Sequence, residues 1–300
     1  MHTLVLGAGF SGTHIAQHAQ RQGPVCVTRR SAASLDALSA EGMDVVQLSA
    51  PDLLSDQSLI EKAISKELKQ QLSKTTHLIS CVGPGRSAPL DDPILRLLES
   101  ENVHLPQLQW VAYLSTIGVY GHHDGNWIDE DTPCTSEQSR SIMRREAELG
   151  WQRKAASWQV PLSILRLSGI YGPGRNAVED AIAGRARMLI KPNQVFNRIH
   201  VEDLAAATLL CAERRFDGVI NITDDLPAAP QDIIMYAHAL VNKPAPQAMD
   251  FATADITDMA RSFYSENKRV SNALSKQALG MRYRYPTYKE GLDALYQARS

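Results

Sequence analysis

The sequence predicts an α/β protein built around a doubly wound parallel sheet, with a smaller lobe formed by the C-terminal part. The first observation is the segment 3–14, which joins a short apolar strand to a helix through Gly7-x-Gly9-x-x-Gly12. The second is that short apolar strands alternate with helical stretches through the first two thirds of the chain. This alternation is typical of parallel sheets whose two faces are covered by helices. Together the two observations predict a Rossmann-type fold.

The glycine pattern predicts a site for the pyrophosphate of a dinucleotide. Gly7 makes the tight turn, Gly9 lets the backbone approach the pyrophosphate, and Gly12 lets the helix pack closely on the strand. The helix N-terminus faces the negative charge. Phe10 and Ser11 lie between these glycines and complete the predicted site. The structural alternative is a tight strand-to-helix turn that binds no ligand.

The next strand predicts which dinucleotide is bound. A helix over 13–22 ends at Gly23-Pro24, and a strand follows over 25–28. At the end of this strand an acid would bind the adenosine ribose, whereas arginine matches a 2′-phosphate. Because Arg29 and Arg30 stand there, we predict NADP(H) as the cofactor and consider NAD(H) the less favoured choice. The alternative is a solvated basic turn.

A third and a fourth strand are predicted over 44–48 and 77–82, with a polar helix over 55–72 between them. The run 77–82 is continuously apolar apart from His77 and Ser80, as expected for a strand covered on both faces. Cofactors lie across the carboxyl ends of such strands, so Val82 and Gly83 are predicted to pass close to the nicotinamide half. A plain turn is the alternative for these residues.

Later elements predict how the chain divides. Strands are expected over 110–116, 162–167 and 218–222, and helices over 177–188, 232–240 and 271–279, with another helix opening at His200. The loop at 171–175 and the helical tail after Pro227 interrupt the alternating pattern. We therefore predict a dinucleotide-binding domain formed by 1–168 with 199–226, and a small substrate-binding lobe formed by 169–198 with 227–300.

Composition excludes several classes of partner. The 300 residues carry 31 Lys and Arg against 33 Asp and Glu, which disfavours binding to nucleic acid. Apolar runs are too short for a membrane span, and the N-terminus lacks the layout of a signal peptide. The four cysteines lie far apart without a C-x-x-C pair, so no disulfide framework or metal site is expected. These features predict a cytoplasmic protein with reduced thiols that acts on a small molecule.

Several further motifs identify a family resemblance. They include Ser115-Thr-x-x-Val-Tyr-Gly121, Asp129-Glu-Asp-Thr-Pro133, the run from Arg166 to Gly174, and Arg198-Ile-His-Val-Glu-Asp-Leu204. With the glycine triplet they resemble the extended short-chain dehydrogenase/reductase superfamily, specifically the NAD-dependent epimerase/dehydratase family that acts on nucleotide-linked sugars. The similarity covers nearly the whole chain. It implies a dimer formed through the helices that include 140–151, although that face of the helix is equally suited to cover within one monomer.

The resemblance assigns catalytic positions and also shows a departure. In the family, a Ser or Thr at the position of Thr116 binds the substrate oxygen, and a Tyr-x-x-x-Lys pair supplies the acid and base. Here Arg140 stands at the Tyr position and Arg144 at the Lys position. Because a guanidinium stays protonated in proteins, Arg140 is not a general base, and Arg144 only retains a positive charge near the cofactor. The chain therefore resembles an atypical member of the family.

Other residues are candidates for the missing proton donor, and the sequence does not choose among them. They are Tyr120, His122, His123, Tyr171 and His200. A second Tyr-x-x-x-Lys string, from Tyr264 to Lys268, lies in the predicted lobe, outside the cofactor sheet. Arg175 and Arg198 are predicted to clamp a diphosphate or carboxylate of the substrate. Salt bridges within the lobe are the alternative role for both arginines.

Two functions follow from these expectations. The first is an NADP(H)-dependent oxidoreductase or epimerase in which Thr116 polarises a carbonyl or alcohol. Reduction demands less of the missing base than oxidation, since solvent can protonate an alkoxide held by donors such as Thr116 and Arg140. The second is a sensor or scaffold protein that binds NADP(H) without chemistry.

Overall fold

A computed structural model describes residues 1–31, 35–48, 60, 64–85, 92–101 and 103–299, and it divides into two compact units. Unit 1 comprises Met1–Val119, Glu137–Arg166 and Leu204–Ile220. Unit 2 comprises Tyr120–Ser136, Leu167–Asp203 and Asn221–Ser300. This division differs from the predicted one chiefly in assigning 120–136 to unit 2. The physical reason is that strand β6 (Trp127–Ile128) of this segment pairs with β13 (Arg269–Val270).

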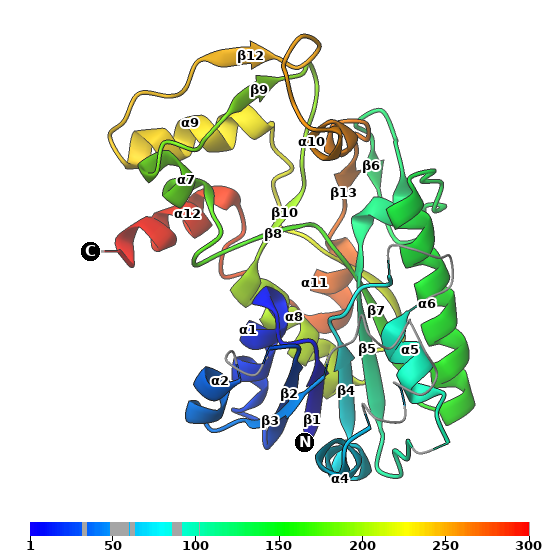
Figure 1. Cartoon of the computed structure of the whole chain (residues 1–300). Coiled ribbons are helices and arrows are strands. Elements are labelled where there is room, and N and C mark those ends of the chain that lie inside the picture. The colour runs from blue at the N-terminus through cyan, green and yellow to red at the C-terminus, as the bar shows by residue number, and fades with distance from the viewer. Residues whose placement is uncertain (32–34, 49–59, 61–63, 86–91, 102, 300) are drawn as a thin grey trace. The chain divides into compact units, whose positions relative to one another are not determined.

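Unit 1 is organised by a parallel sheet of seven strands in the order β11-β7-β5-β4-β1-β2-β3 (Figure 1). Of the seven strands of this sheet, β11 comes last along the chain. It begins at Gly218 in unit 1, and its last two residues are assigned to unit 2. The bounds of the seven strands are β1 Thr3–Leu6, β2 Val25–Arg29, β3 Asp44–Gln47, β4 His77–Ser80, β5 Trp110–Thr116, β7 Leu162–Leu167 and β11 Gly218–Ile222. Every residue of β1, β4 and β7 is buried, as expected for strands covered on both faces. The predicted doubly wound α/β fold is confirmed.

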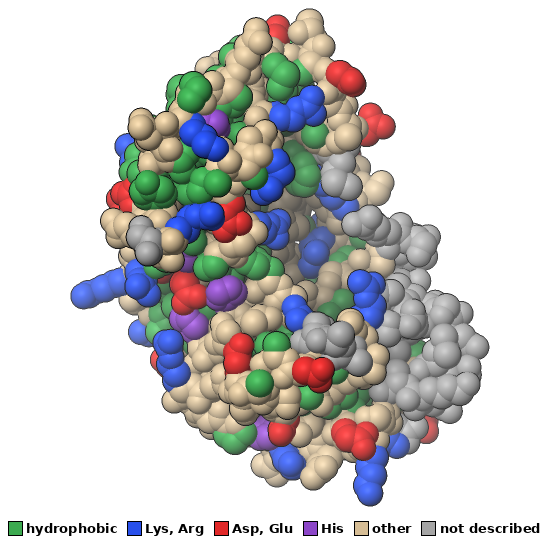
Figure 2. Space-filling model, turned by 60° about the vertical axis from the view of Figure 1, so that its left-hand side comes forward, with side chains coloured by type: hydrophobic (Ala, Val, Ile, Leu, Met, Phe, Trp, Pro, Cys, Tyr) green, Lys and Arg blue, Asp and Glu red, His purple; other side chains and the backbone are tan. Residues whose placement is uncertain are grey.

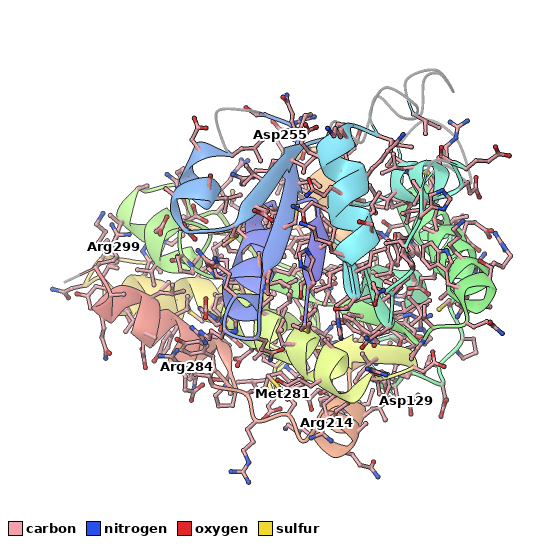
Figure 3. The ribbon with its side chains drawn as sticks, turned by 90° about the horizontal axis from the view of Figure 1, so that it is seen from below. Asp129, Arg214, Asp255, Met281, Arg284 and Arg299 are labelled. Carbon is pink, nitrogen blue, oxygen red and sulfur yellow. The ribbon has the colours of Figure 1, made fainter. Side chains whose placement is uncertain are left out.

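Helices flank this sheet and complete its core. Their bounds are α1 Phe10–Ala19, α2 Asp36–Ala40, α4 Lys66–Lys74, α5 Pro93–Leu98, α6 Ser139–Trp158 and α8 Val201–Arg214, with a 3₁₀ turn η3 at Ile117–Tyr120. One apolar cluster joins strand residues such as Leu4 and Tyr113 to Leu68 of α4, Leu97 of α5 and Trp151 of α6. Helix α8 ends at Arg214, which is labelled in Figure 3. Burial of these apolar side chains stabilises the folded state of unit 1.

The first residues of two helices in unit 1 differ from the prediction. The first helix begins at Phe10 rather than Thr13, because Gly9 is its N-cap and the glycine loop leads directly into the first turn. Of the helix predicted over 55–72, residues 55–59 and 61–63 lie outside the described residues. The described α4 begins after Ser65, whose hydroxyl accepts a hydrogen bond from the amide of Leu68.

Unit 2 consists of short helices and three two-stranded parallel pairs. The pairs are β8 (Gly169–Tyr171) with β10 (Arg198–His200), β9 (Met188–Ile190) with β12 (Ala248–Asp250), and β6 with β13. The helices are α7 Ala177–Ile182, α9 Pro230–Leu240, α10 Asp258–Phe263, α11 Ala273–Leu279 and α12 Tyr288–Gln297. Tyr171, Val178, Ile233 and Leu292 belong to a separate small apolar core formed largely by α7, α9 and α12.

The helix predicted over 177–188 is wrong in its second half. Helix α7 ends at Ile182, and the chain then enters strand β9 at Met188. Gly184 has a φ of 65°, a left-handed conformation that commonly ends helices. The apolar residues that suggested a longer helix therefore belong to two elements.

Surface features agree with the composition. On the face drawn in Figure 2, Lys and Arg side chains are interspersed with Asp and Glu. None of the described helices combines the length and the apolar character needed to traverse a bilayer.

Candidate cofactor-binding and catalytic site

The glycine loop in unit 1 has a backbone that side chains would disrupt at two of its three glycines. Gly7 has a φ of 90°, and a Cβ atom placed on it would lie 2.7 Å from Cγ2 of Val82. A Cβ on Gly12 would clash with the carbonyl oxygen of Gly7. Around Gly9 no atom lies within 4 Å of such a Cβ. Gly7 and Gly12 are thus required by packing, whereas Gly9 leaves an opening at the start of the helix.

Among the described residues, no side chain caps the N-terminus of α1 beside this opening. Gly9 is the N-cap and supplies no side chain to the first amides, and the first turn of α1 contains no acid. Phe10 and Ser11 are the first two helical residues, both half-buried. Helix N-termini carry unsatisfied N–H groups and a partial positive charge, which together bind phosphate oxygens.

Thr28 of β2 holds the glycine loop in place. Its hydroxyl accepts a hydrogen bond from the amide of Gly7 at 3.0 Å, and its carbonyl accepts one from the amide of Ala8 at 2.8 Å. Sequence reasoning missed Thr28, because a threonine within an apolar strand carries no local signal of a bond to a distant loop.

Arg29 and Arg30 follow Thr28 at the carboxyl end of β2. Arg29 is the last residue of the strand and is half-buried, and Arg30 is exposed. The chain carries no acid between β2 and Asp36. Basic side chains therefore occupy the position where an NAD-selective site would present a carboxylate.

The carboxyl end of β4 lies next to the glycine loop. The amide of Cys81 donates to the carbonyl of Leu6, and the side chain of Val82 approaches Gly7. Val82 and Gly83 are both half-buried. Burial raises the pKa of the Cys81 thiol to about 12, so this thiol is neutral at physiological pH. The edge of the sheet that holds the glycine loop thus continues into Val82 and Gly83.

Arg144 connects the ends of β4 and β5. A Cβ atom on Gly83 would lie 2.7 Å from Nη2 of Arg144. Nη1 of Arg144 donates to the carbonyl of Leu114 at 2.8 Å and to the Tyr113 hydroxyl at 3.3 Å. Burial raises the pKa of Tyr113, which keeps its phenol neutral beside this cation. The residue at the family's Lys position therefore supplies a fixed positive charge.

Arg140 differs from Arg144 in its surroundings. It is the second residue of α6, and its side chain is exposed. A permanently charged, exposed guanidinium does not reproduce the acid and base behaviour of a tyrosine. Of the two arginines predicted at the Tyr-x-x-x-Lys positions, Arg144 is thus anchored and Arg140 is exposed.

Thr116 ends strand β5, and its hydroxyl caps the following turn. The oxygen accepts a hydrogen bond from the amide of Gly118 at 3.1 Å. A hydroxyl that accepts one bond still has its proton to donate. Thr116 is half-buried, so it combines the capping role with the ability to donate to a substrate oxygen.

Three candidate proton donors in 120–123 are engaged within unit 2. The buried Tyr120 donates its hydroxyl to Oδ1 of Asn221 at 2.8 Å. His122 is paired with Asp124 and accepts from the amide of Asn267. His123 Nε2 lies 3.0 Å from the carbonyl oxygen of Tyr120. These contacts assign all three side chains a role in holding the loop.

The aromatic rings of Tyr171 and His200 make an edge-to-face contact inside unit 2. The ring of His200 lies 5.1 Å from that of Tyr171 and 4.0 Å from that of Tyr285, measured between ring centroids. Both residues are buried, and burial raises the pKa of Tyr171. A phenol with a raised pKa is a poor general base at neutral pH.

The two arginines predicted to clamp a substrate anion lie in different environments. Arg175 is exposed in the loop between β8 and α7. Nη1 of Arg198 instead donates to the carbonyls of Phe196 and Ala228 at 3.0 and 3.3 Å. Burial lowers the pKa of Arg198, an effect opposed by the nearby Asp224. Arg198 therefore ties backbone segments of unit 2 together, and the accessible member of the pair is Arg175.

Comparisons with known proteins agree with this architecture. A conserved protein of unknown function from Silicibacter pomeroyi DSS is 39% identical, with a TM-score of 0.84 over 100% of this chain and 99% of that one. The UDP-glucose 4-epimerase of Thermus thermophilus, solved with NAD, is 19% identical, with a TM-score of 0.75 over 100% of both chains. The dTDP-glucose 4,6-dehydratase of Bacillus anthracis, also solved with NAD, is 17% identical, with a TM-score of 0.72 over 99% and 96%.

The comparison with curated proteins gives no match. The model of the NAD dependent epimerase/dehydratase family matches residues 3–223, which is most of the chain and includes the glycine loop, Arg140 and Arg144 of α6, and strand β11. The chain therefore belongs to the NAD-dependent epimerase/dehydratase family.

Proposed function

We propose that unit 1 binds NADP(H) and that the protein is an oxidoreductase or epimerase. The observation that carries the proposal is the open N-terminus of α1 beside Gly9, followed one strand later by Arg29 and Arg30. The residues fit a dinucleotide because a phosphate group can reach the amides of Phe10 and Ser11 without meeting a side chain at Gly9. Val82 and Gly83 extend the same edge toward the nicotinamide half.

The preference for NADP(H) depends on charge at the end of β2. A 2′-phosphate carries negative charge and several acceptor oxygens, which arginine binds as a planar, multidentate donor. A ribose with a free 2′-hydroxyl offers no such charge. The Thermus thermophilus epimerase was solved with NAD, so a preference for NADP(H) would be a specific property of this chain.

The proposed substrate is a carbonyl or alcohol compound, with nucleotide-linked sugars as the first class to examine. When bound, the nicotinamide would supply hydride exchange with the substrate carbon. Thr116 donates a hydrogen bond to the substrate oxygen, and Arg144 keeps a positive charge fixed beside Leu114. Reduction is the favoured direction, because an alkoxide held by such donors takes its proton from water and needs no strong base.

A titration of the purified protein with NADPH and NADH tests the cofactor. Hydrogen bonds to charged groups contribute about 1.5–3 kcal/mol each, so we expect NADPH to bind roughly 10- to 100-fold more tightly than NADH. The double variant Arg29→Asp with Arg30→Ala should remove most of this difference. Arg153→Ala, an exposed arginine on α6, is the matched control and should retain it. Equal affinity of the unaltered protein for both cofactors would contradict the proposal.

The second candidate function is an NADP(H)-binding sensor or scaffold without catalysis. The observation that favours it is the pair Arg140 and Arg144 at positions where the family carries its proton-transferring Tyr and Lys. Monitoring the oxidation of bound NADPH with nucleotide sugars, aldehydes and ketones separates the two. Turnover with any of them supports the enzyme, and binding without turnover across the panel supports the sensor.

A further inference from the structure

Ser141 lies beside Thr116 in unit 1, although the two residues are 25 positions apart in the sequence. A Cβ atom placed on Gly118 would lie 3.2 Å from Oγ of Ser141 and 3.4 Å from Oγ1 of Thr116. A side chain on Gly118 would crowd both oxygen atoms, so the two hydroxyl groups border the same side of this glycine. No sequence motif points to Ser141.

Both hydroxyl groups have a proton to donate. The hydroxyl of Thr116 accepts from the amide of Gly118, which leaves its own proton uncommitted. Ser141 is 4% exposed, and its hydroxyl makes no hydrogen bond within the described part of the chain. The oxygen atom itself is reached by solvent, so a bound ligand can take the place of water as the acceptor of its proton.

The position of Ser141 in α6 adds a favourable field. Ser141 is the third residue of this 20-residue helix, whose N-cap Gln138 makes no capping hydrogen bond with its side chain and whose first turn contains no acid. The partial positive charge of a helix N-terminus favours an oxygen that is gaining negative charge. Arg144, one turn further along, holds its guanidinium on the carbonyl of Leu114 and adds positive charge to the same end of β5.

We propose that Ser141 is a catalytic residue that, together with Thr116, binds one oxygen atom of the substrate. This inference deepens the proposed function, since it depends on a carbonyl or alcohol substrate. The hydroxyl of Ser141 donates a hydrogen bond to the carbonyl oxygen and stabilises the alkoxide that reduction produces. It does not act as a base, because an alcohol has far too high a pKa. The hydroxyl groups of Ser141 and Thr116 thus provide the hydrogen bonds to the substrate oxygen that a tyrosine would otherwise donate.

Crystals of the protein grown with NADP⁺ and soaked separately in acetone and in acetate test this pairing without any need for turnover. We expect one oxygen atom of each probe within hydrogen-bond distance of both Ser141 Oγ and Thr116 Oγ1. Ser141→Ala should lose the bound probe. Ser139→Ala, which removes an exposed hydroxyl from the same turn of α6, is the matched control and should retain it.

Absence of the probe from the hydroxyl pair, or binding to Thr116 alone, would overturn the proposal. Failure of NADP⁺ to bind instead counts against the proposed function, and the probe can still be located in the same crystals. If the panel of carbonyl compounds yields a substrate, Ser141→Ala should lower kcat roughly 10- to 100-fold, as for loss of one donor to an oxyanion. Its affinity for NADPH should stay within a few-fold of the unaltered protein. An unchanged kcat would also overturn the assignment.

Discussion

At the scale of single residues, the three glycines of the first loop have different physical roles. Gly7 needs a left-handed backbone, and Gly12 needs the helix and the strand-to-helix turn in direct contact. A Cβ atom placed on Gly9 would have no other atom within 4 Å, so packing within the protein does not require a glycine there. In the proposed function, the lack of a side chain at Gly9 leaves room for the phosphates of the cofactor.

This difference gives a paired prediction. Gly12→Ala should lower the free energy of unfolding by about 1–3 kcal/mol, because overpacking forces the backbone to shift. Gly9→Ala should cost no more than about 1 kcal/mol, the difference between glycine and alanine at an N-cap. Urea unfolding without cofactor measures both.

NADPH binding completes the comparison of the two glycines. Gly9→Ala should weaken NADPH binding by much more than its small effect on stability, since its methyl group occupies the approach to the helix amides. Retention of full NADPH affinity by a folded Gly9→Ala protein would show that the cofactor lies elsewhere.

At the scale of elements, the bounds of the buried strands were predictable from the sequence. The ends of the helices depended on capping residues and on the backbone conformation of single glycines. Strands β5, β7 and β11 have the predicted bounds, because each is a largely apolar run between polar or glycine-containing loops. Helix α1 begins earlier than predicted since Gly9 acts as its N-cap. Helix α7 is shorter because Gly184 adopts a left-handed backbone.

Asp92 links two helices of unit 1 and provides an element-scale prediction. Its carboxylate caps α5 by accepting from the amides of Ile94 and Leu95, and it also accepts from Nε1 of the buried Trp151 in α6. Asp92→Ala should lower the free energy of unfolding by about 2–4 kcal/mol, since both the cap and the partner of a buried indole are lost.

Ser65→Ala is the matched control for this substitution. Ser65 caps α4 through a single bond to the amide of Leu68, so its replacement should cost about 1 kcal/mol. Equal losses of unfolding free energy in the two variants would show that the bond to Trp151 contributes nothing.

At the scale of the whole molecule, each unit carries its own buried charges. In unit 1, Glu148 is paired with Arg166 and accepts from the hydroxyl of Ser115 at 2.5 Å, so its charge is balanced. In unit 2, Asp224 is 1% exposed, and its Oδ2 has no hydrogen-bond partner among the residues that the structure describes. Burial raises the pKa of Asp224 to about 8, an effect that Arg198 opposes.

The raised pKa of Asp224 predicts how stability depends on pH. The unfolded chain releases the proton near pH 3.9, whereas the folded protein holds it until about pH 8, so the contribution of Asp224 to stability falls as pH rises through this interval. Asp224→Asn stays neutral throughout. The unfolding free energy of this variant relative to the unaltered protein should therefore rise by about 1–3 kcal/mol between about pH 4 and 8.

Urea unfolding at a series of pH values measures this difference. Asp255→Asn, which replaces an exposed carboxylate labelled in Figure 3, is the control and should show little change of this kind. A constant difference between Asp224→Asn and the unaltered protein across the interval would mean that Asp224 is ionised in the folded state.

The sequence by itself determined the parallel sheet, the glycine loop and the basic residues at the end of β2. These features are local, because strand burial, left-handed turns and helix starts leave their patterns in neighbouring residues. It also predicts that Arg140 and Arg144 stand at the positions of the family's Tyr-x-x-x-Lys pair, since that comparison needs only the order of residues.

Only the tertiary structure decided which side chains meet. It brought Ser141 to Thr116 across Gly118, tied Thr28 to the glycine loop, and engaged Tyr120 and His200 inside unit 2. These contacts join segments that are distant in sequence. The physical reason is that packing of whole elements, and not the residues on either side, sets the position of a side chain at the end of a strand or helix.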